Sequence, residues 1–232
     1  MTSPITFHAE FDQGSEQWLQ ARCGLLTASE MKLIVTPTLK MASNDKERAH
    51  LFELLAQRIT GFVEPQYVSD AMLRGQEDEL CARAEYEKHF APVQTCGFIT
   101  NSRYGFTLGY SPDGLVGADG LIECKSRMQK HHLATLLDNV PAATCPDDFL
   151  IQCQTGLLVS ERQWLDFISY CAGMHMCVIR VWPDDKVQAA ILEAAAAFEA
   201  RLAKRLAEYA DLLASDARLV PTERRIEQEM ML

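Results

Sequence analysis

The chain has 232 residues, of which 48% are hydrophobic, so it is long enough to bury a full core. Its 22 basic and 32 acidic residues give a formal charge of -10, which argues against coating nucleic acid through overall charge but leaves room for a local basic groove. No cationic start followed by an apolar run is present, and no window approaches the ~20 apolar residues of a membrane span. We therefore expect a cytoplasmic protein with no membrane partner.

Helical patterns occupy the first part of the chain, about 11–91. A short amphipathic helix is predicted over 15–22. A second is predicted over 27–34, because Thr27 stands three residues before Glu30, the spacing of a capping box. This pattern places a helix N-terminus just after Arg22.

Two longer helices are predicted next. The first runs from 44 to 61, where Gly61 is a suitable C-cap. The second runs from 69 to about 90. Its inward residues are expected to be Leu73, Leu80 and Ala84.

Short strands are predicted in the second part, about 92–182, because its segments are rich in β-branched and aromatic residues and are separated by turn formers. The predicted strands are 93–101, 104–111, 113–117, 120–126, 164–171 and 177–182. A helix is predicted around 128–138, with a proline-containing loop after it. We expect all parts of residues 1–232 to form one domain.

The third part, about 184–232, begins with a long Ala-rich helix that ends near residue 213. Its apolar stripe is interpreted as core packing, with a partner-binding face as the alternative. The stripe consists of Val187, Ile191, Phe198, Leu202, Leu206 and Tyr209. The tail after Ala217 is interpreted as a frayed terminus, with a docking helix as the alternative.

The eight cysteines are irregularly spaced and include no C-x-x-C motif, so we expect reduced thiols. Cys171 and Cys177 flank His175, a combination that suggests zinc. A tetrahedral zinc site needs a second pair of ligands, and none has suitable spacing. Ordinary buried cysteines are the preferred interpretation.

The stretch "SPDGLVGADGLIECKS" (111–126) carries the most chemistry. Alternate side chains of a strand share a face, so Glu123 and Lys125 project to one side while Cys124 points away. If residues 117–120 form the turn, Asp113 lies within about one residue of Glu123 across the ladder. Two carboxylates and an ammonium group then converge.

A hard divalent cation relieves the repulsion between two close carboxylates by taking their oxygens as ligands. Magnesium is the natural occupant, and the backbone carbonyl of Cys124 supplies another oxygen. Lys125 adds a cation that orients a water or stabilises charge on a phosphate, which suits phosphodiester hydrolysis. Separately, a turn with Asp113 and a strand with Glu123 and Lys125 fit a solvated salt bridge, but their combination favours a metal site.

This combination resembles the PD-(D/E)xK nuclease core, which is restriction-endonuclease-like, with a central mixed β-sheet flanked by helices in an α/β fold. Five segments in order and spacing also resemble the phage lambda exonuclease family, also called YqaJ-type viral recombinases or alkaline exonucleases. These segments are "WLQARCGLLTASEM" (18–31), "RGQEDELCARAEYE" (74–87), "GYSPDGL" (109–115), "LIECKS" (121–126) and "FLIQCQTGLLV" (149–159). The resemblance covers roughly residues 11–180.

The resemblance implies a Mg²⁺-dependent, processive 5′-to-3′ exonuclease on linear double-stranded DNA that leaves 3′ overhangs. It implies two Mg²⁺ ions, with Mn²⁺ as a substitute, and a ring-shaped homotrimer that encloses DNA, with an acidic outside and a modestly basic channel. The partner would be a single-strand annealing protein of a phage-type recombination pair. A phage or prophage origin, with action in the bacterial cytoplasm, follows from the same resemblance.

The resemblance also implies roles for individual residues. Asp113 and Glu123 match metal-binding carboxylates, the Cys124 carbonyl a backbone ligand, Lys125 the catalytic lysine, and Glu79 a further acidic residue at the metal. The residues that match a pocket for the terminal 5′ phosphate are Arg22, Ser29, Ser111 and Gln152. Met72 lies where relatives present apolar residues that part the strands, so we interpret it as a strand wedge.

Elementary chemistry supports part of this assignment and leaves alternatives. Arg22 offers a planar, permanently charged fork, and Ser29 is predicted in the first turn of a helix, where free N–H groups favour an anion. The alternative is that Arg22 pairs with Glu30 or another acid while Ser29 caps the helix. For Glu79 the alternative is a solvated acidic helix face.

Two other functions remain open from the sequence. One is another nuclease on the same core, an endonuclease or a repair nuclease, which would cut closed circular DNA. The iron–sulfur relatives are disfavoured because the clustered cysteines are missing and Leu158 stands four residues after Gln154, where they carry tyrosine. The other is a non-catalytic protein that binds DNA ends, which the intact Asp113, Glu123 and Lys125 set disfavours.

Overall fold

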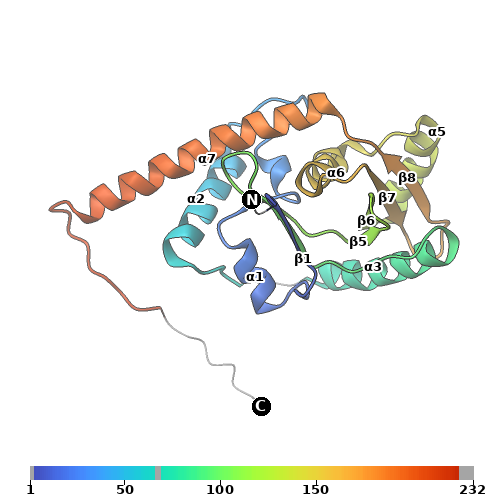
Figure 1. The fold of residues 1–232 in the computed structure, drawn as a ribbon, viewed down its shortest axis with the longest axis horizontal. Coiled ribbons are helices and arrows are strands. Elements are labelled where there is room, and N and C mark those ends of the chain that lie inside the picture. Colours follow the sequence, from blue (N-terminus) through green and yellow to red (C-terminus); the bar gives the residue numbers. More distant parts are fainter. Residues whose placement is uncertain (1–2, 66–68, 225–232) are drawn as a thin grey trace, which may run out of the picture.

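The computed structural model describes residues 3–65 and 69–224, and Figure 1 shows the arrangement of the chain. The helical elements are α1 (Glu16–Arg22), η1 (Met31–Leu33), α2 (Asp45–Thr60), α3 (Asp70–His89), α4 (Gln129–Ala134), η2 (Thr135–Asn139), α5 (Val140–Ala142), α6 (Asp147–Ser160) and α7 (Asp185–Leu213). The strands are β1 (Ile5–His8), β2 (Leu26–Thr27), β3 (Phe98–Asn101), β4 (Leu108–Tyr110), β5 (Gly114–Val116), β6 (Gly120–Ser126), β7 (Trp164–Tyr170) and β8 (Cys177–Val181). Residues 225–232 of the tail, interpreted from the sequence as a frayed terminus with a docking helix as the alternative, lie outside the described residues.

The strands form two mixed four-stranded sheets. The first has the order β1-β3-β4-β2, with β2 parallel to β4 and the other pairs antiparallel. The second has the order β5-β6-β7-β8, with β6 parallel to β7. The predicted α/β fold with mixed strands and flanking helices is confirmed, and the expected central sheet is divided in two.

Helix α6 links the two sheets, because it packs against β3 and β4 of the first and β7 of the second. From Ile151 to Ser160 it is buried almost all round, as expected for a helix enclosed by strands on two sides and by α7 on a third. Gly156 in α6 allows the closest approach to the first sheet, where a Cβ atom would lie 2.7 Å from a ring carbon of Tyr110. A glycine at this position therefore brings α6 directly onto the ring.

Helices α2 and α7 form a pair along one side of the molecule (Figure 1). Asn44 caps α2 through its side chain, and Gly61 ends it in a left-handed conformation, as predicted. The Arg58 guanidinium of α2 binds both carboxylate oxygens of Glu199 in α7, at 2.8 and 2.7 Å. The same Arg58 donates to the backbone carbonyl of Gly24, so α2 also braces the loop that leads into β2.

The apolar stripe of α7 is buried only as far as Leu202. Phe198 and Leu202 belong to the core, whereas Leu206 and Tyr209 are exposed. The helix continues past the body of the protein, as Figure 1 shows. Core packing is therefore confirmed for the residues up to Leu202 and is wrong for the last two of the stripe.

The inward face of α3 differs from the prediction. Leu73, Leu80 and Ala84 are exposed, and the helix instead buries Ala82 and Tyr86 against the second sheet. A hydrogen bond accounts for this orientation of α3, because the Tyr86 hydroxyl donates to the buried carboxylate of Asp166 in β7 at 2.7 Å. This orientation turns the Leu80 side of α3 toward an open pocket.

The predicted helix over 27–34 is wrong in its first half. Leu26 and Thr27 pair with Leu108 and Gly109 of β4 as a parallel strand, and only a 3₁₀ turn, η1, follows. The predicted loop after residue 138 is also shorter than expected, because η2 and α5 continue the helical path to Ala142. All eight cysteines are described, and each is a free thiol, as predicted.

Candidate active site

The β5–β6 hairpin brings Asp113 and Glu123 together. Gly114 pairs with Ile122 in the antiparallel ladder, so the residue before Gly114 lies opposite the residue after Ile122, as the sequence predicted. The Asp113 carboxylate is buried and accepts a 2.5 Å hydrogen bond from the backbone N–H of Cys124. The Cys124 side chain faces the opposite way, into a small apolar cluster beneath α3.

Glu123 is only 1% exposed, and three groups donate to its carboxylate. The Tyr110 hydroxyl binds one oxygen at 2.8 Å. The Lys125 ammonium and the Gln152 amide both bind the other oxygen, at 2.7 and 2.5 Å. These contacts come from three different elements, β4, β6 and α6, so the orientation of Glu123 is set by the tertiary structure.

Charge is concentrated at this point. Burial, together with the charges of Glu123 and Glu79, raises the pKa of Asp113 well above its ordinary value. Burial alone lowers the pKa of Lys125, but the Glu123 and Asp113 carboxylates outweigh it, so the lysine pKa lies above its ordinary value and the side chain stays charged. The site thus holds close carboxylates with one ammonium among them.

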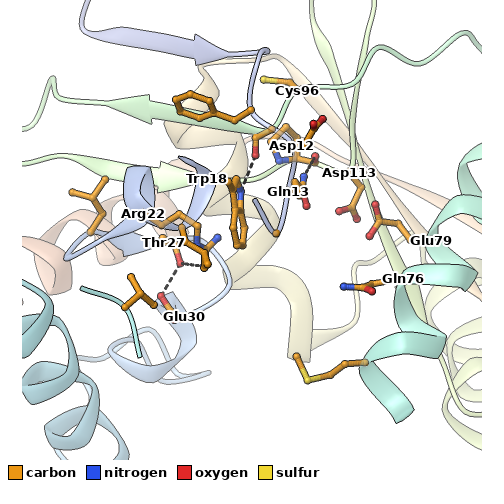
Figure 2. Close-up of a pocket in the computed structure, with 18 of the residues that line it drawn as sticks. Asp12, Gln13, Trp18, Arg22, Thr27, Glu30, Gln76, Glu79, Cys96 and Asp113 are labelled. Carbon is orange, nitrogen blue, oxygen red and sulfur yellow. Dashed lines mark hydrogen bonds between the residues drawn. The ribbon is translucent and has the colours of Figure 1, made fainter. Parts of the chain in front are cut away.

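Glu79 reaches the same place from α3, and Figure 2 shows its carboxylate beside that of Asp113 on one side of the pocket. Burial raises the pKa of Glu79 and the Glu123 charge adds to this rise, whereas Arg83 opposes it. The Arg83 guanidinium binds Glu79 at 2.8 Å, one helical turn along α3. Glu79 is half-buried at the pocket, so it belongs with the Asp113 and Glu123 carboxylates and not with the fully solvated acids of the helix.

A second polar group surrounds Arg22 at the end of α1. The guanidinium donates to the hydroxyls of Ser111 and Thr27, at 3.3 and 3.4 Å, and its carbon lies 4.4 Å from the centre of the Trp18 ring. Ser29 is exposed, and its hydroxyl lies 3.4 Å from that of Thr27. The structure thus brings Arg22, Ser29 and Ser111 to one place.

Gln152 lies apart from this group. Its amide binds Glu123, so the structure places it at the carboxylates and not at Arg22. The argument for Ser29 also changes, because this residue lies in a turn and no α-helix begins there. What Ser29 offers is a solvent-facing hydroxyl beside a guanidinium.

Both groups line one pocket of about 1270 Å³, larger than the roughly 300–1,000 Å³ of small-molecule sites. Figure 2 shows Asp113 and Glu79 on one side of it and Arg22 with Trp18 on the other. Residues that line the pocket include Trp18, Arg22, Glu30, Met72, Glu79 and Asp113. Met72, 48% exposed, stands at this pocket near the start of α3.

Comparison with known proteins shows to which family this chain is related. Residues 17–163 match the YqaJ-like viral recombinase domain. The crystal structure of LHK-Exo, an alkaline exonuclease from Laribacter hongkongensis, is similar with 31% sequence identity and a TM-score of 0.75, over 86% of this chain and 98% of that chain. The chain belongs to the YqaJ-like viral recombinase family. A structure of LHK-Exo in complex with dAMP gives the same identity, coverage and TM-score.

A phage-related exonuclease from Haemophilus somnus 129PT shares the fold of this viral recombinase domain at 11% identity, with a TM-score of 0.59 over 80% of this chain and 96% of that chain. These relatives confirm the PD-(D/E)xK fold class that the sequence predicted. None of the curated proteins matches the chain.

The residues of this family member fit a divalent cation. Asp113, Glu123 and Glu79 supply carboxylate oxygens, the ligands that Mg²⁺ and Mn²⁺ prefer. Burial first, and then the charge of neighbouring carboxylates, raises the pKa values of Asp113 and Glu79, and a bound cation would offset both effects. The Cys124 carbonyl would add a neutral oxygen on the same strand.

Four residues that make hydrogen bonds or ion pairs in the site were not predicted from the sequence. Tyr110 orients Glu123, Arg83 pairs with Glu79, and Trp18 donates from its indole N–H to Ser111 at 2.9 Å. Gln13 donates to the backbone carbonyl of Pro112 at 2.9 Å. Only the helical i, i+4 spacing of Trp18 with Arg22, and of Glu79 with Arg83, was available as a signal.

In the part of the chain that the structure describes, no helix combines the length and apolar character that a membrane crossing requires.

Proposed function

We propose that this chain is a Mg²⁺-dependent 5′-to-3′ exonuclease on linear double-stranded DNA, with Mn²⁺ as a substitute and two ions in the site. The observation that carries the proposal is the pocket that holds both groups: carboxylates of Asp113 and Glu79 on one side and the Arg22 guanidinium on the other. A carboxylate group suits a metal and a guanidinium suits a terminal phosphate. The family relationship and the exonuclease relative support the same reaction.

Each side chain has a defined role in this reaction. Asp113, Glu123, Glu79 and the Cys124 carbonyl would hold the cation, which would supply charge neutralisation at the phosphate and activation of a water. The Lys125 ammonium, anchored on Glu123, donates to the scissile phosphate as negative charge develops.

The Arg22 pocket selects the end of the DNA. Its guanidinium is held by Ser111 and Thr27 and stacks on Trp18, so it is oriented before the substrate arrives. We propose that Arg22, Ser29 and Ser111 bind the terminal 5′ phosphate. Gln152 is proposed to act at the metal site instead, where its amide donates a hydrogen bond to the Glu123 carboxylate and orients it.

The remaining features belong to the same proposal. Met72, at the pocket edge, is the strand wedge. Leu80, which follows it on α3 and is also exposed at the pocket, adds apolar surface for a base displaced from the duplex. We propose that residues 1–232 act as one domain in a homotrimer ring, which encloses DNA and makes digestion processive. The product would be a 3′ single strand for an annealing protein in the bacterial cytoplasm, as part of phage-type recombination.

The first experiment is digestion of end-labelled linear duplexes that carry either a 5′ phosphate or a 5′ hydroxyl, beside a closed circle, in Mg²⁺. We expect loss of the 5′-phosphorylated strand and an intact circle. Cutting of the circle would support the endonuclease alternative and contradict the exonuclease proposal. Absence of digestion in Mg²⁺ and in Mn²⁺ would support the non-catalytic alternative.

A further inference from the structure

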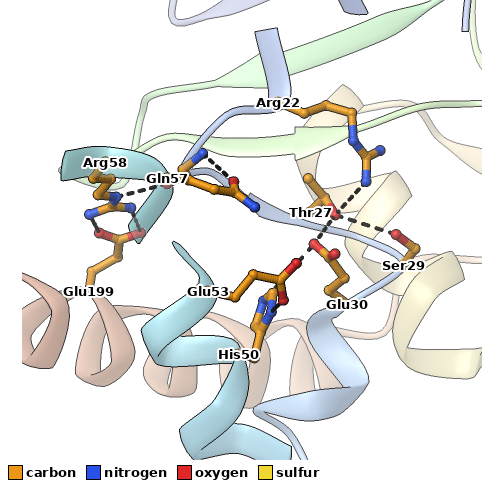
Figure 3. A network of polar contacts seen from close by, with 10 residues as sticks. Arg22, Thr27, Ser29, Glu30, His50, Glu53, Gln57, Arg58 and Glu199 are labelled. Carbon is orange, nitrogen blue, oxygen red and sulfur yellow. Dashed lines mark hydrogen bonds and ion pairs between the residues drawn. The ribbon is translucent and has the colours of Figure 1, made fainter. Parts of the chain in front are cut away.

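A second group of metal-ligating side chains borders the same pocket. Glu30 and Glu53 line the pocket, and Figure 2 shows Glu30 on the side away from Asp113. Glu30, His50 and Glu53 each offer one ligand atom, and these atoms lie within 4.8 Å of one another. Figure 3 shows the two carboxylates and the imidazole ring directed toward one point. Among the described residues, no hydrogen bond or ion pair joins Glu30, His50 or Glu53 to the Asp113 and Glu123 carboxylates.

The group is assembled by two elements that are distant in sequence. His50 and Glu53 are one turn apart on α2, so they share a face of that helix. Glu30 lies in the turn before η1, and its carboxylate accepts a 2.7 Å hydrogen bond from the Thr27 hydroxyl. Glu30 and Glu53 both line the pocket, so a small ion has access to them from solvent.

The decisive observation is on His50, whose side chain is only 1% exposed. One ring nitrogen, Nδ1, lies 3.1 Å from the Glu53 carboxylate. The other, Nε2, is buried and has no hydrogen-bond partner among the described residues. A buried polar atom without a partner costs ~1–3 kcal/mol, so binding of an ion to Nε2 would be favourable.

The distance from His50 Nε2 to the nearer Glu30 oxygen is 4.0 Å. This separation is too long for a hydrogen bond, yet two ligands that each lie ~2.0–2.2 Å from one ion are separated by up to about that distance. The Glu53 carboxylate lies 3.1 Å from the other ring nitrogen, Nδ1, so its side chain would have to turn to share an ion with Nε2 and Glu30, and its 41% exposure leaves space for that rotation. One ligand atom of each residue already lies within 4.8 Å of the others, so the group supplies three protein ligands, and water would complete the coordination.

We propose that Glu30, His50 and Glu53 bind a divalent first-row transition metal ion such as Mn²⁺ or Zn²⁺, in a site separate from the Asp113 and Glu123 carboxylates. One imidazole with two carboxylates favours these ions over Mg²⁺, which prefers oxygen ligands alone. Tetrahedral or octahedral coordination would be completed by water from the pocket.

The ion has a consequence for the pocket, and this consequence rests on the proposed function. Glu30 and Glu53 place two carboxylates on the side of the pocket that holds Arg22, where they would repel a terminal phosphate. A divalent cation cancels their charge, so Arg22 presents its charge to the phosphate without opposition. The same site then strengthens binding of DNA ends.

The test uses Mn²⁺ and the full chain with Asp113→Asn, which weakens the other carboxylate site. The free Mn²⁺ signal in electron paramagnetic resonance is titrated for this parent, for Asp113→Asn with Glu53→Gln, and for Asp113→Asn with Glu193→Gln. Glu193 is an exposed acid on α7 and serves as the matched control. Circular dichroism establishes that each variant is folded.

We expect the Glu193→Gln control to bind Mn²⁺ as its parent does, and Glu53→Gln to weaken one ion by about tenfold or more. Electron spin echoes from the bound Mn²⁺ should carry the ¹⁴N coupling of an imidazole ligand, because no histidine is among the proposed ligands of the other site. His50→Gln should remove this coupling. Equal Mn²⁺ binding by the Glu53→Gln and Glu193→Gln proteins, or Mn²⁺ without ¹⁴N coupling, would overturn the proposal whatever the outcome of the DNA digestion.

Discussion

The contact between Gly156 and Tyr110 links the packing of α6 to the orientation of a carboxylate in the candidate active site. Substitution Gly156→Ala would place a Cβ atom 2.7, 2.9 and 3.1 Å from three atoms of the Tyr110 ring. Carbon atoms pack at ~3.5–4.0 Å, so the ring must move by about 1 Å or α6 must move away. Movement of the ring separates the Tyr110 hydroxyl from Glu123, which it contacts at 2.8 Å, and movement of α6 withdraws Gln152 from the same carboxylate.

The expected cost has two parts. Inserting a methyl group into a filled core costs ~1–3 kcal/mol, and both Gly156 and Tyr110 are buried. Loss of a hydrogen bond to a charged group costs a further ~1.5–3 kcal/mol. These costs together are about 2.5–6 kcal/mol, and alanine recovers about 0.5–1 kcal/mol as the better helix former, so we expect Gly156→Ala to lower the free energy of unfolding by about 2–5 kcal/mol. Tyr110→Phe, which removes only the hydroxyl, should lower it by about 1.5–3 kcal/mol.

Urea unfolding followed by circular dichroism measures both values. The matched control is Gly75→Ala in α3, because a Cβ atom there meets nothing within 4 Å. Alanine is the better helix former, so this control should gain about 0.5–1 kcal/mol. An unfolding midpoint of Gly156→Ala equal to or above that of the wild type would refute the reasoning about Tyr110.

Three further predictions concern the charged residues. Lys125→Ala should lower the digestion rate by about 10²–10³-fold with DNA-end binding retained, and normal digestion by this variant would contradict the catalytic assignment. Arg22→Lys loses the planar fork, so the preference for a 5′ phosphate over a 5′ hydroxyl should fall about tenfold or more; an unchanged preference would place the phosphate elsewhere. Burial and the charges of Glu123 and Glu79 raise the pKa of Asp113, so the metal-free protein loses stability as pH rises through that raised pKa. In a chelator, Asp113→Asn should melt above the wild type by a margin that grows with pH, and a margin that shrinks with pH would show that the Asp113 charge is not unfavourable.

Local signals in the sequence were sufficient for several elements. The β5–β6 hairpin follows from a turn between two short apolar runs, and its period of two places Glu123 and Lys125 on one face. Helix α2 follows from its apolar spacing and from caps at Asn44 and Gly61. These features depend on residues close together in the chain, so the sequence specifies them without knowledge of the rest of the fold.

The same local reasoning failed where a distant partner decided the conformation. Thr27 and Glu30 have the spacing of a capping box, and their side chains do bind each other at 2.7 Å. The backbone at Thr27 nevertheless pairs with Gly109 of β4, and this pairing makes it a strand. On α3, the hydrogen bond from Tyr86 to Asp166 in β7 sets the buried face and leaves Leu80 exposed.

The sequence was therefore sufficient to predict which side chains form the carboxylate pair of the candidate active site, but the tertiary structure decided which other residues contact them. Asp113 and Glu123 are adjacent because a hairpin requires it. The contact of Gln152 with Glu123 and the meeting of Glu30 with His50 join elements whose relative positions depend on how the sheets and helices pack. A spacing in the sequence carries no information about such distances, because long-range packing and buried hydrogen bonds determine them together.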